Sequence, residues 1–176
     1  SFESLLPSFI NDYKKSPIGT KYINYNRFDH PATLANINVI RQKLYGDKAS
    51  DDLFIAGEPL MANGPYQYDV HSEDNKRVDN GEEFTVVSSR IIEKQIDYKV
   101  GQRVQRTVEK IKVYEIVGKN TVDGEEVTFN KPINKAAADD LISSERKALQ
   151  EQGKNPNGAF MLNSVLASTI AHGYII

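Results

Sequence analysis

The C-terminal stretch from residue 155 to residue 176 contains no Asp, Glu, Lys or Arg, whereas charged residues occur throughout the chain before it. Within this stretch, residues 159–170 would place apolar side chains around the whole circumference of a helix, so such a helix cannot be solvated on one face of a small monomer. We therefore expect a second subunit to cover it and predict an obligate homodimer. The predicted dimer-interface residues are Leu141, Phe160, Leu162, Val165, Leu166 and Ile170.

Length and composition limit the class of protein. A chain of 176 residues can build one core of ordinary size. The formal net charge of −2 indicates that the molecule as a whole is not a basic nucleic-acid binder, so any RNA contact must come from a local patch. The absence of Cys excludes a disulfide framework and a thiolate metal site. No apolar run reaches the roughly 18 residues of a membrane span, and the N-terminus lacks a signal-peptide pattern.

The first two thirds of the chain read as strands and loops. Alternating apolar and polar residues predict strands over residues 21–27 and 36–41, followed by a loop region over residues 45–65. Asn80-Gly81 predicts a hairpin turn. Two long strands, over residues 84–100 and 104–117, are predicted to meet at a tight turn at Gly101-Gln102, with a distal end that projects beyond the core.

Helices are predicted only at the C-terminal end. Pro132 ends the sheet, and Asn134 is a good N-cap for a helix over residues 135–152 that Gly153 closes. Residues 155–158 break the chain before the final uncharged helix. The predicted fold class is α+β, an antiparallel β-sheet meander followed by two C-terminal α-helices, completed as an intertwined homodimer. It forms one domain, with N-terminal strands and loops (1–82), a central sheet with a long hairpin (83–130) and the two helices (134–176).

This order of elements resembles the coat proteins of single-stranded RNA bacteriophages of the levivirus type. Three segments of the sequence carry the resemblance. They are Glu126-Val127-Thr128-Phe129, which leads into the charged helix, the break at residues 155–158, and the apolar end Gly173-Tyr174-Ile175-Ile176. The strand at residues 107–113, opposite residues 84–90, is similar to the central strand pair of that family. The resemblance covers residues 83–176. It implies dimers that assemble into an icosahedral-type capsid in the virion, made in the host cytoplasm, with one sheet face on the genomic RNA and a role in binding an operator hairpin that represses translation.

The hypothesis for the RNA-facing surface rests on strand alternation. Cations on it would contact phosphate, and Tyr114 would stack on an unpaired base, as single-stranded RNA is usually recognised. The alternative is a solvated sheet face whose Lys and Arg side chains keep the protein soluble. The candidate RNA-binding residues are Ser88, Arg90 and Lys94 on the first long strand and Arg106, Lys110, Lys112 and Tyr114 on the second.

The sequence carries no motif of an enzyme. Asp29-His30-Pro31 and the group Asp69, His71, Glu73 and Asp74 bring acids near histidines, but neither has the spacing of a known metal-ligand set. No Gly-rich phosphate loop and no Gly-x-Ser-x-Gly elbow occurs. His172, in the apolar tail, is expected to be a satisfied or interfacial polar group. We therefore predict no catalysis, no cofactor, no metal and no small-molecule substrate.

A second hypothesis belongs to another class of protein. The long hairpin and the additional N-terminal segment would suit a non-capsid assembly or adaptor module, for example of a phage tail or a secretion apparatus, that docks through the hairpin. A coat protein should copurify with RNA as particles of uniform size, whereas an adaptor should be a small oligomer free of nucleic acid.

Overall fold

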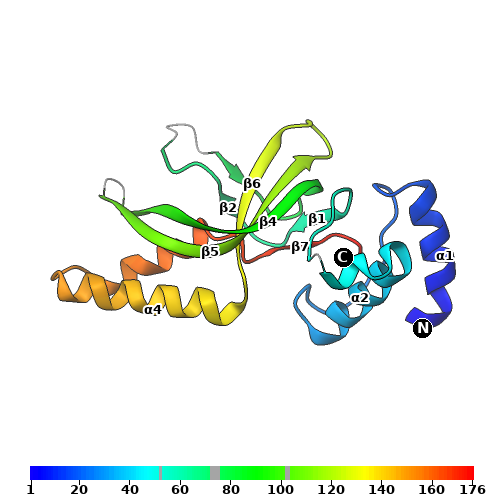
Figure 1. The fold of residues 1–176 in the computed structure, drawn as a ribbon. Helices are drawn as coiled ribbons and strands as arrows, with labels where there is room; N and C mark the ends of the chain where they lie inside the picture. The colour runs from blue at the N-terminus through cyan, green and yellow to red at the C-terminus, as the bar shows by residue number, and fades with distance from the viewer. Residues whose placement is uncertain (52, 72–75, 102–103) are drawn as a thin grey trace.

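The computed structural model describes residues 1–51, 53–71, 76–101 and 104–176. A five-stranded antiparallel sheet of order β6-β5-β4-β1-β7 forms the centre, with helices α1 and α2 at one end and α4 at the other (Figure 1). The prediction of an α+β fold with an antiparallel sheet is confirmed. The elements are α1 (Phe2–Lys15), α2 (Pro31–Tyr45), α3 (Lys48–Asp51), β1 (Pro59–Ala62), β2 (Tyr66–Gln67), β3 (Arg77–Val78), β4 (Glu83–Val100), β5 (Val104–Asn120), β6 (Glu126–Pro132), α4 (Lys135–Glu151), the 3₁₀ helix η1 (Pro156–Ser164) and β7 (Ile170–His172).

Residues 1–82 contain strands and loops, as predicted, in β1, β2 and β3, but also the helices α1, α2 and α3, so the predictions of strands at residues 21–27 and 36–41 are wrong. The helix α2 contains the whole of the predicted strand at residues 36–41, because Thr33, Ile37, Ile40 and Arg41 repeat with helical spacing and are the residues it buries. His30 caps this helix and Pro31 fits its first position. The predicted strand at residues 21–27 is reduced to a single parallel bridge between Tyr22 and Ile175.

The two long strands β4 and β5 are confirmed, as is the helix α4 after its Asn134 cap. The pairing of β4 with β5 is interrupted twice, between Val86 and Ser88 and between Lys94 and Ile96 of β4. The predicted turn at Gly101-Gln102 falls partly outside the described residues. The distal hairpin does not project freely, because α4 and η1 pack against it and bury Ile96 and Tyr98. The apolar stripe of α4 thus covers the hairpin of its own chain.

The uncharged tail does not form the predicted second α-helix. After η1 the chain becomes extended, the amide of Ala167 donates to the carbonyl of Asn130, and β7 pairs with β1. In Figure 1 the tail, drawn in red, runs beneath the sheet from the α4 end to the N-terminal helices. It is apolar on all sides because it contacts α4, the sheet and the N-terminal helices in turn.

The tail residues proposed for a dimer interface are therefore covered without a partner. Leu162, Val165, Leu166 and Ile170 are buried within the single chain. Leu141 is half-buried against the same cluster as Leu162. Phe160 is the exposed member of the predicted set, 47% accessible, with the Arg146 guanidinium 5.1 Å from its ring centroid. The need for a covering subunit is removed, and the homodimer itself stays a prediction.

The described part of the chain contains no helix with the length and apolar character needed to span a membrane.

Candidate functional site

The predicted RNA-binding residues do not share one face of the sheet: Lys112 and Tyr114 lie on the face opposite Ser88, Arg90 and Lys94, whereas Arg106, paired with Tyr98, lies on the same face as those three. Directly paired residues share a face, and Ser88, Arg90 and Lys94 pair with Val117, Glu115 and Ile111. Tyr114 and Lys112 instead pair with Ile91 and Glu93. These β4 residues are the immediate neighbours of Arg90 and Lys94, so their side chains lie on the other face of the sheet. The prediction of one continuous surface is therefore wrong. The irregularity after Val86 shifts the alternation, and strand register cannot be read from the sequence of either strand alone.

Two cations on the face of Ser88, Arg90 and Lys94, share one carboxylate. Glu115 accepts hydrogen bonds from Arg90 and from Lys94, both at 2.9 Å. Hydrogen bonding to Lys94 and Arg90 lowers the pKa of the Glu115 carboxyl, although partial burial opposes the shift. Arg90 and Lys94 are thus held in a local ion-pair network that keeps one net positive charge, and the Arg90 side chain remains 67% exposed.

Arg106 and Lys110 also have local structural roles. The Arg106 guanidinium donates to Glu145 of α4 at 3.1 Å and to Gln152 at 2.9 Å, and Tyr98 donates to the same Glu145 at 2.8 Å. These bonds fasten α4 to the hairpin. Lys110 lies at the second irregularity with a φ of 59°, a left-handed conformation that non-glycine residues rarely adopt. Neither residue joins Tyr114.

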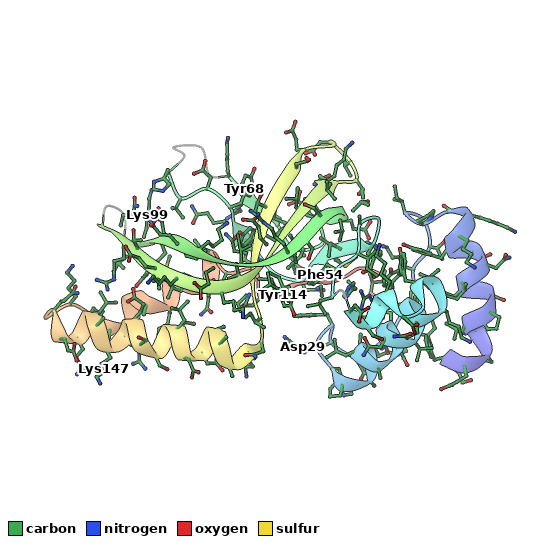
Figure 2. All side chains as sticks on the ribbon, in the orientation of Figure 1. Asp29, Phe54, Tyr68, Lys99, Tyr114 and Lys147 are labelled. Atoms are coloured by element: carbon green, nitrogen blue, oxygen red, sulfur yellow. The ribbon has the colours of Figure 1, made fainter. Side chains whose placement is uncertain are left out.

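The face of Tyr114 carries an open groove. Ile91 of β4, Tyr114 of β5 and Lys131 of β6 are directly paired and form one row across three strands, which we call the Tyr114 row. Figure 2 places Tyr114 and Phe54 close together beneath the sheet, in the region between α4 and α2. A cavity of about 510 Å³ opens there, and Ser88 and Arg90 of the predicted RNA-binding residues border it together with Tyr114. The other lining residues are Lys48, Asp51, Leu53, Phe54, Ile55, Ala56, Val87, Ser89 and Ile91.

The wall of the groove opposite the sheet is held in place by the tail. Phe54 stacks on His172 with ring centroids 4.7 Å apart and meets Tyr114 edge-on at 6.1 Å. His172 also hydrogen-bonds through Nε2 to the carbonyl of Leu53 at 2.8 Å, which confirms the expectation of a satisfied histidine. The orientation of the Tyr114 ring is therefore set before any ligand arrives.

The groove surface combines apolar groups with a few cations. Ile91 is 51% exposed, and Leu53 and Val87 are also exposed. Lys48 on one wall and Lys112, two residues from Tyr114 on the same face, are exposed and form no ion pair with any described residue. Asp51 contributes an opposing charge. An aromatic ring with apolar neighbours and separate cations suits a flat ring attached to an anionic group.

A buried polar network beside the groove was not predicted from the sequence. Glu58 has no exposed surface and accepts from Arg41 at 2.8 and 2.9 Å and from Tyr174 at 2.7 Å. Burial alone would raise the pKa of the Glu58 carboxyl, but nearby His172 and the bonds from Arg41 and Tyr174 outweigh it and lower the pKa to about 2. Because its members come from distant parts of the chain and form no local motif, no sequence signal could have revealed it. It joins α2 to the sheet.

The acid–histidine groups have ordinary structural contacts. His30 accepts a hydrogen bond from the amide of Ala32 at 3.1 Å as the cap of α2. His71 contacts Asp97 at 3.0 Å, while Glu73 and Asp74 lie outside the described residues. Within the described ranges, no cluster of three or more His, Cys, Asp or Glu could hold a metal ion.

Comparison of the sequence with protein-family models and with curated proteins gives no match. Neither comparison supports the coat-protein resemblance, which stays a prediction.

Proposed function

We propose that this protein binds single-stranded nucleic acid in the groove beside Tyr114. The observation that carries the proposal is the Tyr114 ring, half-buried on an open sheet face, with the exposed Ile91 beside it and Phe54 fixing its orientation. An unpaired base can stack on such a ring, whereas the stacked bases of a duplex cannot reach it.

Stacking supplies most of the expected binding energy. One base on an aromatic side chain contributes on the order of 1–3 kcal/mol, with little dependence on the base, because every base has a π-face. We expect backbone phosphates to contact Lys48, which lines the groove, and Lys112, which lies outside the lining but on the same face of β5 as Tyr114. With so few cations and a net charge of −2, we expect binding that depends only weakly on salt.

The larger assembly predicted from the coat-protein resemblance is separate from this proposal. Formation of a capsid and recognition of an operator hairpin stay predictions, and the main reason for them, a tail in need of a partner, no longer applies. The adaptor hypothesis has one observation in its favour, because Leu53, Val87 and Ile91 would also accept apolar side chains of a protein. Such docking would use the groove and not the distal hairpin, which α4 covers.

Fluorescence anisotropy with labelled oligothymidine, oligouridine and a blunt duplex tests the proposal. We expect the protein to prefer both single strands over the duplex. Tyr114→Ala should weaken binding at least about fivefold, the lower end of one lost stacking contact, while Tyr114→Phe should retain it. Tyr68→Ala is the matched control, since Tyr68 is an exposed tyrosine outside the groove lining. Equal binding by wild type, Tyr114→Ala and Tyr68→Ala, or no binding to either single strand, would overturn the proposal.

The salt dependence provides an independent check. Each single-strand phosphate neutralised contributes a slope of roughly −0.7 to a plot of log affinity against log salt concentration. Lys112→Ala should therefore make the slope shallower by about that amount, with an equal effect on all sequences. An unchanged slope would remove Lys112 from the binding surface.

A further inference from the structure

We propose that Lys131, which lies beside the groove as the β6 partner of Tyr114, is a phosphate anchor, and that its ammonium binds a backbone phosphate of the strand whose base stacks on Tyr114. This inference rests on the proposed function and assigns a role to a residue outside the predicted surface.

The sheet register places Lys131 next to the stacking site. Lys131 of β6 pairs directly with Tyr114 of β5, so the two side chains leave the same face of the sheet on strands about 4.8 Å apart. Ile91 flanks Tyr114 on the other side. A base on Tyr114 would therefore have an apolar neighbour on one side and a cation on the other.

The Lys131 ammonium is positioned by the backbone of the tail. Nζ donates to the carbonyl of Ser168 at 3.1 Å and to that of Ile170 at 2.7 Å. An ammonium has three donors, so one remains for a ligand. These two bonds also hold the side chain in one place, which reduces the entropy lost when an anion binds.

Lys131 lacks a counter-charge among the described residues. On β5, the same face carries Tyr114 and another cation, Lys112. Of the acids on this side, Glu93 is the strand partner of Lys112 and Asp51 lines the groove, and neither forms an ion pair with Lys131. Glu115 lies on the opposite face and binds Arg90 and Lys94. A largely buried ammonium without an anion is unfavourable, and desolvation lowers the pKa of Lys131 to about 8. A phosphate would supply the missing charge and favour the protonated form.

Proton uptake on binding follows from this arrangement. Near pH 8, about half of the Lys131 side chains would be neutral in the free protein, so binding a phosphate should take up as much as about half a proton per strand. Near pH 6 the amine is already protonated and the uptake should vanish. Affinity should accordingly decrease as the pH rises above 8.

Isothermal titration calorimetry with oligothymidine, in two buffers of different ionisation enthalpy at about pH 8, measures this uptake. Lys131→Met should abolish the uptake and weaken binding roughly tenfold. Lys131→Arg should bind at high pH without the uptake, because a guanidinium stays charged. Lys147→Met is the matched control, since Lys147 is an exposed lysine on α4, far from Tyr114 in Figure 2.

The outcomes separate the two proposals. If wild-type protein binds no single strand, the proposed function and the Lys131 role both fail. If binding depends on Tyr114 but is unchanged in Lys131→Met and involves no proton uptake, the proposed function is retained and the proposed role of Lys131 fails. Lys131 then serves only to hydrogen-bond the tail to β6. Thermal melting of each variant shows whether it is folded, and should Lys131→Met not fold, persistent proton uptake in Lys131→Arg would overturn the Lys131 role.

Discussion

At the scale of single residues, Glu58 shows how a buried charge can be stabilised by its surroundings. Its carboxylate receives two hydrogen bonds from Arg41, one from Tyr174 and one from the amide of Ile55 at 2.8 Å. Arg41 also donates to the carbonyl of Ala49. Removal of either charged partner would take the opposite charge away from a buried group, which is the costly case for an internal ion pair.

We predict that Glu58→Gln destabilises the fold by roughly 3–5 kcal/mol at neutral pH, because the Arg41 charge stays buried. The pKa of Glu58 is lowered from 4.5 to about 2 on folding, so its ionisation stabilises the fold above pH 4.5, and this contribution is lost as the pH falls from 4.5 through 2. Urea unfolding at pH 7 and near pH 3 should show a smaller difference between wild type and variant at the lower pH.

Glu126→Gln is the control for this experiment, since Glu126 is an exposed carboxylate of β6. It should leave the free energy of unfolding nearly unchanged at both pH values. A Glu58→Gln variant as stable as Glu126→Gln would contradict the structural role of the network.

Also at the residue scale, the sequence predicted part of the candidate site. Alternation on β5 placed Tyr114 and Lys112 on one face, which the register confirms. It could not place Ile91, Phe54 or Lys131 beside them, because these neighbours depend on pairing between strands and on a loop far away in the chain. Side-chain periodicity reports the face of one strand and carries no information on which strand lies next to it.

At the scale of elements, long periodic segments were predicted well and short ones were not. The strands β4 and β5 and the helix α4 have many repeats and clear end signals, such as the Asn134 cap. The window at residues 36–41 is too short to separate period 2 from period 3.6, and the surrounding helix decides its conformation. The prediction of a second α-helix in the tail is wrong because an all-round apolar surface fits an extended chain inside one molecule as well as a helix between two.

The irregularity at Lys110 gives a prediction for the hairpin element. A residue with Cβ in the left-handed region loses about 1–2 kcal/mol relative to an ordinary conformation, whereas glycine adopts it readily. We expect Lys110→Gly to be more stable than Lys110→Ala by about 1 kcal/mol, measured as the difference in free energy of unfolding in urea.

Lys119→Gly and Lys119→Ala provide the comparison, since Lys119 is an exposed lysine of the same strand with ordinary backbone angles. There the order should reverse, because glycine weakens a regular strand. The same order at both positions would show that the left-handed conformation of Lys110 does not persist in solution.

At the scale of the whole molecule, the tail connects three separate hydrophobic cores. Leu162, Val165 and Leu166 belong to the core under the distal hairpin. Ala167 and Ile170 belong to the core formed with residues of β1, β4, β5 and β6. Tyr174 and Ile175 complete the core between α1 and α2. One uncharged segment thus joins both ends of the molecule to the sheet, so its burial should decide whether the chain unfolds as one cooperative unit.

Ile170→Ala tests whether the chain alone covers its tail. Truncation of a fully buried isoleucine should lower the free energy of unfolding by roughly 2–5 kcal/mol, and the urea midpoints of wild type and variant should not change with protein concentration. A partner subunit that covered the tail would instead raise both midpoints as the protein concentration increases, by mass action.

Phe160→Ala further separates a monomer from a dimer. The Phe160 ring is exposed, so its loss should matter little in a monomer, but a concentration-dependent loss of stability in this variant would place Phe160 at a dimer interface.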